Sequence, residues 1–394
     1  MIKKVFSVCG VLTAFLLVSC TERTATVEAL PGVDARGQTC FVTSDGSMHE
    51  VSLAGIRVSQ LVNGYFSAST PDGVTVYSFS NGKAEAVSGL SGLKTAGFMS
   101  CGVIPVCRPG GHIELVDGNG ERVALLELEN GDITECAPYF VDGVLVVTDR
   151  DGYQGLVDTK GKFIIVPTYE SIGPITDGKM IAMSDKEHGS LLLQHYYVID
   201  TDGKMVYDFE ENVPVSLTLK NDKAVIRSEQ GFAVLDVNNG VMTELPSFVR
   251  HIDSAARGYI VYRDAKGLRG LLDLDGNTIL GASYRQLRIG PDGTVAANTG
   301  TKWMVIDIKT GLHRDMPDLM MLSPIEAAAY DKGFAFVGKS SAGYFIINRN
   351  GDRMNSEPLR EVDYSRLSTA YVATDYPAFT APEEMPGDYT GEFE

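Results

Sequence analysis

Short apolar runs separated by polar turns extend along almost the whole chain. Examples are residues 143–147, 179–183, 258–262 and 333–337, which begin at Gly or Lys and continue with residues such as Val, Ile, Met, Phe or Tyr. Runs of this kind, bounded by Gly, Asp, Asn or Ser, are typical of β-strands, and no long stretch has the period of an amphipathic helix. The pattern therefore predicts an all-β protein.

The polar turns recur at a regular interval of 35 to 42 residues. Many of them carry an Asp shortly before the turn glycine, and Asp-x-x-Gly between β-rich runs predicts a hairpin in which Asp caps the turn and Gly adopts a positive φ. A pattern with this period indicates a repeat architecture. The turn glycines are Gly46, Gly82, Gly120, Gly161, Gly203, Gly240, Gly276, Gly311 and Gly351.

Each repeat has room for four strands: one on each side of the turn glycine, one further upstream, and a short apolar segment between units such as 169–172. Four strands in roughly 40 residues match a blade of a β-propeller. The sequence thus predicts a propeller of eight to nine four-stranded blades. The alternatives are an open β-solenoid or two smaller propellers in tandem.

The two ends of the chain bear on closure of the ring. The first unit, around Gly46, has no clear upstream strand, whereas residues 369–375 have the pattern of an upstream strand and belong to no unit. If this strand completes the first blade, N- and C-terminal strands close the ring and no sheet edge stays open there. We therefore expect a propeller domain over 40–376, followed by an acidic tail over 377–394.

Two units resemble a known repeat. Residues 154–169 and 269–284 contain a Gly (Gly155, Gly270), an apolar pair, an Asp, a turn glycine, an apolar run and a Tyr, and in this they resemble the WG repeat. Neither unit has the Trp of that repeat, and the single Trp of the chain, Trp303, is followed by Met304. The resemblance supports a β-repeat fold and implies an interaction protein more than a particular activity.

The N-terminus predicts export and lipid attachment. Lys3 and Lys4 precede an apolar run over 5–18, which is too short to span a membrane but suits a signal peptide. The run ends in Leu-Val-Ser-Cys, which resembles a bacterial lipobox, and this resemblance implies cleavage before Cys20 and a diacylglycerol on its thiol. We expect a signal peptide over 1–19 and a lipidated tether over 20–39. Thr21 after the Cys favours the outer membrane in the cell envelope.

Charge restricts the partners. Without residues 1–19 the chain has 32 basic residues against 51 acidic ones, a net charge of −19. Such a balance repels nucleic acid and anionic lipid surfaces, so we expect no nucleic-acid partner. The membrane attachment would come from the lipid on Cys20 alone.

No cysteine or histidine arrangement predicts a metal site. Cys40, Cys101, Cys107 and Cys136 include no Cys-x-x-Cys pair. The compartment permits disulfides, but buried Cys in a β core also behaves as a small apolar residue. Six histidines are scattered without a ligand spacing, although a propeller tunnel could still gather distant residues into one site; they are His49, His112, His188, His195, His251 and His313.

The remaining candidates for chemistry have structural explanations. Asp-x-Asp-Gly at 149–152, 200–203 and 273–276 is similar to a calcium loop, but it falls mostly on hairpin positions and lacks the downstream bidentate Glu. Residues 184–190 form a polar excursion that we interpret as a loop, with an accessory contact surface as the functional alternative. We predict no catalytic residue, no cofactor and no metal.

These observations lead to two hypotheses on function. The first is a lipid-anchored propeller that acts as an interaction scaffold for an unknown protein or carbohydrate partner. The second is a hydrolase or lyase acting on polysaccharide, with a composite site in the central tunnel. The motifs favour the scaffold.

Overall fold

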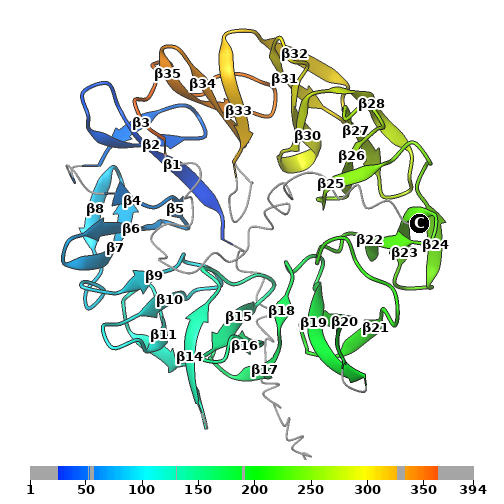
Figure 1. Cartoon of the computed structure of the whole chain (residues 1–394). Coiled ribbons are helices and arrows are strands. Elements are labelled where there is room, and N and C mark those ends of the chain that lie inside the picture. The colour runs from blue at the N-terminus through cyan, green and yellow to red at the C-terminus, as the bar shows by residue number, and fades with distance from the viewer. Residues whose placement is uncertain are drawn as a thin grey trace, which may run out of the picture.

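The computed structural model describes residues 25–51, 53, 57–129, 131–188, 191–325 and 333–362, with backbone alone for 186–193 and 292. Figure 1 shows these residues as a ring of small sheets around a central axis, with the N-terminal strands in blue beside the C-terminal strands in orange. The described residues are almost entirely β, with a single short 3-10 helix, η1 (Pro291–Gly293). The predicted all-β propeller is confirmed.

The first half of the ring contains four blades. Blade 1 is β1 (Val27–Val33), β2 (Thr39–Thr43) and β3 (Met48–Glu50); blade 2 is β4 (Arg57–Val58), β5 (Leu61–Val62), β6 (Tyr65–Thr70), β7 (Gly73–Ser80) and β8 (Lys83–Ala86); blade 3 is β9 (Thr95–Ala96), β10 (Ile104–Cys107), β11 (Ile113–Val116) and β12 (Arg122–Leu125); blade 4 is β13 (Glu127–Leu128), β14 (Gly131–Cys136), β15 (Val144–Asp149), β16 (Gln154–Asp158) and β17 (Phe163–Tyr169).

The second half contains five more. Blade 5 is β18 (Ser171–Ile172), β19 (Lys179–His188), β20 (Leu191–Asp200) and β21 (Met205–Asp208); blade 6 is β22 (Lys223–Ser228), β23 (Gly231–Asp236) and β24 (Val241–Glu244); blade 7 is β25 (His251–Ala256), β26 (Tyr259–Arg263), β27 (Arg269–Asp273) and β28 (Thr278–Tyr284); blade 8 is β29 (Gln286–Ile289), β30 (Thr294–Asn298), β31 (Trp303–Asp307) and β32 (Leu312–Met316); blade 9 is β33 (Leu319–Pro324), β34 (Phe334–Ser340) and β35 (Gly343–Asn348).

The blades are antiparallel, and neighbouring strands pair from the axis outward except in blade 2, where β4 and β5 both pair with β6. Blades 3, 5, 7 and 8 have four strands each, and blades 1 and 2 share one sheet in the order β3-β2-β1-β5-β6-β7-β8. In blade 6 the inner position is taken by residues around Pro214, which bridges Ile226, and in blade 9 the outer position is taken by Arg353, which bridges Ile347. The described units therefore number nine, one for each turn glycine.

The meander gives the ring two different sides. Turns from the first to the second strand lie beside turns from the third to the fourth: Thr201 N donates to Gly178 O at 3.1 Å and Asn238 Nδ2 to Asp222 Oδ2 at 2.9 Å. We call this side the turn face. The opposite face carries the turns from the second to the third strand, such as those at Asp149 and Asp264.

The turn glycines have the predicted conformation. All nine have φ between +69° and +85°, a region that only glycine occupies without strain. The Asp before the turn accepts backbone hydrogen bonds; Asp158 Oδ1, for example, accepts from Lys160 N and Lys162 N at 2.9 Å. Hairpin chemistry thus accounts for the repeated Asp and Gly.

Glycine is needed at most of these turns for a second reason. A Cβ at Gly120 would lie 2.2 Å from Ser88 O and one at Gly161 would lie 2.4 Å from Ala124 Cβ, both on the preceding blade. Five of the nine turn glycines have such a neighbour closer than 3.0 Å to the added Cβ: Gly46, Gly120, Gly161, Gly203 and Gly351. The turn therefore sets the distance between blades as well as the hairpin.

Blades 9 and 1 close the ring. Val33 N donates to Glu361 O at 2.9 Å, and Arg360 N donates to Val33 O at 2.8 Å. One apolar cluster joins both ends of the chain and includes Val27, Leu30, Cys40, Val42, Phe334, Val337, Ile346 and Leu359. This contact rules out the open solenoid, and the single ring rules out two propellers in tandem.

The first blade differs from the prediction. It does have an upstream strand, β1, which pairs with β2 from Ala29 opposite Thr43 to Val33 opposite Thr39. The absence of that strand was a wrong prediction, because Pro31 and Gly32 interrupt the apolar pattern although the backbone at both is extended within β1. Residues 27–33 therefore belong to the propeller and lie within the range that we expected to be tether.

The predicted closing strand, 369–375, lies outside the described residues and remains a prediction. The inner edge of β1 is already occupied at both ends, by β5 at Val27 and Ala29 and by Arg360 and Glu361 at Val33. The C-terminal chain therefore reaches blade 1 upstream of the predicted strand.

Apolar clusters between consecutive blades form the core, and the cysteines belong to them. Cys107 and Cys136 are buried in the cluster between blades 3 and 4, Cys101 packs against it, and Cys40 is buried in the closing cluster. The described part of the chain contains no disulfide bond. In this position Cys serves as a small apolar residue.

Candidate functional site

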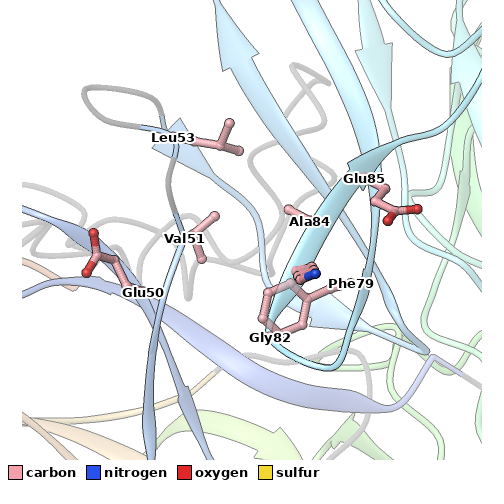
Figure 2. Close-up of a pocket in the computed structure, with 8 residues that line it drawn as sticks. Glu50, Val51, Leu53, Phe79, Gly82, Ala84 and Glu85 are labelled. Atoms are coloured by element: carbon pink, nitrogen blue, oxygen red, sulfur yellow. The ribbon is translucent and has the colours of Figure 1, made fainter.

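A groove of about 290 Å³ opens on the outer rim between blades 1 and 2. Figure 2 shows Val51 and Leu53 on one side of it and the β7–β8 hairpin, with Phe79 and Ala84, on the other. The volume is close to the lower limit for a small-ligand site. The full lining is Glu50, Val51, Leu53, Phe79, Gly82, Lys83, Ala84 and Glu85.

The groove lies where the repeated contact between blades is missing. A Cβ at Gly82 would meet nothing within 4 Å, whereas the equivalent glycines of the neighbouring units, Gly46 and Gly120, lie directly against the preceding blade. The β7–β8 turn therefore stands away from β3. Among the described turn glycines, only Gly311 resembles Gly82 in lacking this contact.

The wall of the groove is apolar and fixed by aromatic packing. The Phe79 ring lies 5.4 Å from Phe41 and 6.2 Å from Phe66, both edge-on, and Phe66 stacks on Tyr77 at 5.2 Å. Aromatic pairs of this geometry add to the stability gained from burial. Phe79 is thus held in place on the groove side of the blade 2 core.

Two carboxylates flank the apolar wall. Glu50 and Glu85 are both exposed and both line the groove, and Arg36 Nη2 lies 3.6 Å from Glu50 Oε2. Lys83 is the one basic residue of the lining. An apolar wall between two carboxylates suits a group that is apolar and carries a positive charge beside it.

The calcium-like Asp residues cap their own turns. Asp149, Asp200 and Asp273 each accept two backbone hydrogen bonds through Oδ1, at 2.8 to 3.1 Å, from residues two and four positions later in the chain. In the same kind of turn, the backbone hydrogen bond from Glu121 holds the pKa of Asp117 below its usual value. No group of three potential ligands occurs among the described residues.

Two of the histidines have carboxylate partners. His195 is buried, with Nε2 2.6 Å from Asp208 Oδ1 and its ring 4.6 Å from Tyr197. His251 lies 3.6 Å from Asp253, and burial together with Arg263 lowers the pKa of the His251 imidazole. Sequence reasoning missed the His195–Asp208 pair because the two residues come from different strands of blade 5.

The predicted loop over 184–190 was wrong. β19 and β20 stay paired from Lys179 opposite Asp200 to His188 opposite Leu191, so blade 5 carries a long hairpin on the opposite face. Both strands are ten residues long, which is longer than the other described strands of the ring. They stay regular over this length because each residue of one strand pairs with a residue of the other. Composition alone suggested a loop, because polar residues dominate one strand only.

The positions that carry Trp in the WG repeat are polar here and connect neighbouring blades. Gln154 Oε1 accepts a hydrogen bond from Ile172 N of blade 5 at 2.7 Å, and Arg269 Nη1 donates to Arg285 O next to blade 8. The Gly that follows each is sterically required, since a Cβ at Gly155 would lie 2.4 Å from Ile165 O. Gln154 and Arg269, where the WG repeat has Trp, thus each form a hydrogen bond with the backbone at or beside the following blade.

No protein-family model matches the chain, and no curated protein matches it in sequence. Among solved structures, a crystal structure of a eukaryotic initiation factor aligns with a TM-score of 0.57 at 11% identity, over 86% of this chain and 97% of the other. BamB from Moraxella catarrhalis aligns with a TM-score of 0.37 at 14% identity, over 70% and 94%. The WD40 β-propeller domain of Doa1 aligns at 0.30 and 13%, over 74% and 91%.

These similarities concern the fold alone and say nothing about the function of this chain. The first similarity indicates shared architecture only, because identity is low, and the other two are too weak to support an argument. The WG resemblance remains a prediction. No helix among the described residues is both long and apolar enough to cross a membrane. Cys20, the predicted lipid attachment site, lies outside the described residues.

Proposed function

We propose that this protein is a lipid-anchored component of the bacterial cell envelope, at the outer membrane, whose propeller is an interaction scaffold. The groove between blades 1 and 2 supports the scaffold part of this proposal. Here the turn glycine, Gly82, has no contact with the preceding blade among the described residues, and apolar side chains line an accessible groove.

The partner that fits the groove best is a protein segment with an apolar side chain next to Lys or Arg. The apolar side chain would lie against Phe79 and Ala84, and the basic group would lie near Glu50 or Glu85. A carbohydrate could stack on an aromatic ring here and donate hydroxyl hydrogen bonds to the carboxylates, but a neutral sugar would not match their negative charge. We therefore favour a protein partner.

Filling the groove tests the proposal. The soluble domain is exposed to a displayed peptide library and to a glycan array, and the selected binders are compared with Ala84→Trp and Glu85→Lys. We expect peptides that combine apolar and basic residues, with binding lost in both variants. The matched controls are Thr243→Trp and Glu244→Lys, at exposed positions of the outer strand of blade 6. Equal binding by Ala84→Trp, or selection of glycans alone, contradicts the proposal.

The anchor is tested separately. Cys20→Ala should abolish incorporation of labelled fatty acid and release the protein from membranes. Labelling that persists in this variant excludes Cys20 as the attachment site.

A further inference from the structure

The described chain begins on the turn face of the ring. Thr26 N donates to Asn63 Oδ1 at 3.3 Å, Asn63 N donates to Thr26 O at 3.2 Å, and Gly64 N donates to Glu28 Oε2 at 3.0 Å. Asn63 and Gly64 form the turn between the first and second strands of blade 2. Ala25, the first described residue, is fully buried in the closing cluster. The N-terminal chain is therefore fixed to this face.

Little chain separates this point from the lipidated cysteine. Five peptide units connect Cys20 to Ala25, and a fully extended chain of five residues spans at most about 18 Å. The strands of a blade are themselves about 17 Å long. Reaching the opposite face would take almost the whole extended tether and would leave none of it to pass the loops of that face, so a lipid on Cys20 cannot enter a membrane there.

We propose that the turn face lies against the bilayer in which Cys20 is anchored, and that the opposite face points away from it. This inference rests on the proposed lipid anchor. The surface that contacts the turn face is a phospholipid bilayer. The orientation of the ring on it follows from the fixed start of the described chain and from the short tether to Cys20.

Exposed apolar side chains near the turn face can contact a bilayer, although Tyr153, in the Asp149 turn of the opposite face, is also 43% exposed. Several outer strands begin with exposed apolar side chains one or two residues after the turn glycine. Met205, Val241, Met242 and Leu312 are 55%, 56%, 52% and 46% exposed. Apolar side chains of this kind partition into the boundary between headgroups and acyl chains. The long β19–β20 hairpin, by contrast, extends on the face that points away.

Two identical turns on opposite faces provide the experiment. Lys160 N donates to Asp158 Oδ1 at 2.9 Å on the turn face, and Lys266 N donates to Asp264 Oδ1 at 2.8 Å on the opposite face. Both lysines occupy the same position of an Asp-x-Lys-Gly turn and both are exposed. Lys160→Trp and Lys266→Trp therefore place a fluorophore in matched surroundings, over the constant signal of the buried Trp303.

The lipidated full-length variants are reconstituted into phosphatidylcholine vesicles with and without a brominated phosphatidylcholine. We expect a loss of fluorescence in Lys160→Trp and no change in Lys266→Trp relative to the parent protein. Acrylamide should quench both variants alike in detergent, which shows that both indoles are accessible. Equal quenching by brominated lipid, or stronger quenching of Lys266→Trp, overturns the orientation.

Mass spectrometry of Cys20 and flotation with the vesicles separate the two proposals. A lipidated protein that floats but shows no difference between the variants refutes the orientation and leaves the anchor intact. A protein without lipid on Cys20 refutes the anchor and with it the orientation.

Discussion

The closing contact between blades 9 and 1 differs in kind from the contacts among blades 4 to 7 on the turn face. At the closure, buried apolar side chains such as Leu359, Phe334 and Val27 pack in one cluster, and backbone hydrogen bonds at Val33 complete it.

Blades 4 to 7 add a line of polar contacts to their apolar cores. Asp142 Oδ2 accepts from Gly178 N at 3.1 Å, Asp177 pairs with Lys220 at 2.9 Å, and Lys179 pairs with Asp222 at 2.5 Å. Lys223 and Asp275 extend the line to blade 7.

The difference shows what each kind of contact does. Neighbouring blades are held by covalent connection and by their shared core, so half-exposed ion pairs refine an interface that already exists. The closure joins residues from the two ends of the chain and needs the larger free energy of apolar burial. Four changes test this comparison.

Truncation of Leu359 should have the largest effect. Leu359 is fully buried in the closing cluster, and Leu359→Ala is expected to lower the free energy of unfolding by about 2–5 kcal/mol. Leu235→Ala, at an equally buried site between blades 5 and 6, is the control. Hydrogen exchange should increase in blades 1 and 9 for Leu359→Ala only. Equal exchange there in both variants would mean that closure is no special point of the ring.

Gly46→Ala should come next. Its φ is +82° and a Cβ would lie 2.1 Å from Met354 O of blade 9, so the substitution strains the turn and pushes the closing blades apart. Gly82→Ala has a similar φ of +75° and no neighbour. The positive φ should lower the free energy of unfolding of both variants by about 1–2 kcal/mol. Overpacking should lower that of Gly46→Ala by about 1–3 kcal/mol more, as measured by thermal unfolding. If Gly46→Ala and Gly82→Ala were destabilised equally, the backbone at Met354 would move aside without a loss of stability.

Alkaline pH should weaken the closure through Cys40. Burial raises the pKa of the Cys40 thiol to about 11 from an ordinary 9.0. Because the folded-state pKa is the higher one, this contribution to stability is complete below pH 9 and is lost as the pH rises through 11. The loss should reach about 2 kcal/mol in denaturant unfolding, and Cys40→Ala should lack it. A parallel pH dependence in both proteins contradicts this assignment.

The ion pairs of blades 4 to 7 should have the smallest effect. Lys179→Met removes the pair with Asp222 and should cost about 0.5–1 kcal/mol at low salt. The cost should decrease in high salt, which screens partly exposed charges, whereas the cost of Leu359→Ala should stay the same. A Lys179→Met effect that does not depend on salt would assign it to lost packing of the lysine stem.

The sequence allowed the repeat, the hairpins and the blade number to be predicted because each depends on neighbouring residues. Asp158 and Gly161 make their turn by themselves, and the same Asp-x-x-Gly turn recurs at Gly120, Gly203 and Gly276. β1 was missed because Pro31 and Gly32 hide an extended strand. The β19–β20 hairpin was missed because pairing partners, and not composition, extend it. The groove at Gly82 was missed although the sequence differs there: Asn81 and Gly82 form a two-residue turn between Ser80 and Lys83, with no Asp before it, so this hairpin is tighter than those of the other units.

The sequence by itself therefore determined the blade: strand order, turn chemistry and the need for glycine at positive φ all follow from local sterics and hydrogen bonding. Only the tertiary structure decided which blade meets which, where the repeat leaves a groove and on which face the chain begins. Those features depend on contacts between residues far apart in the chain, such as Val33 and Glu361. The local pattern of apolar and polar residues does not determine how far apart such residues lie. Their distance is determined by the packing of the whole ring.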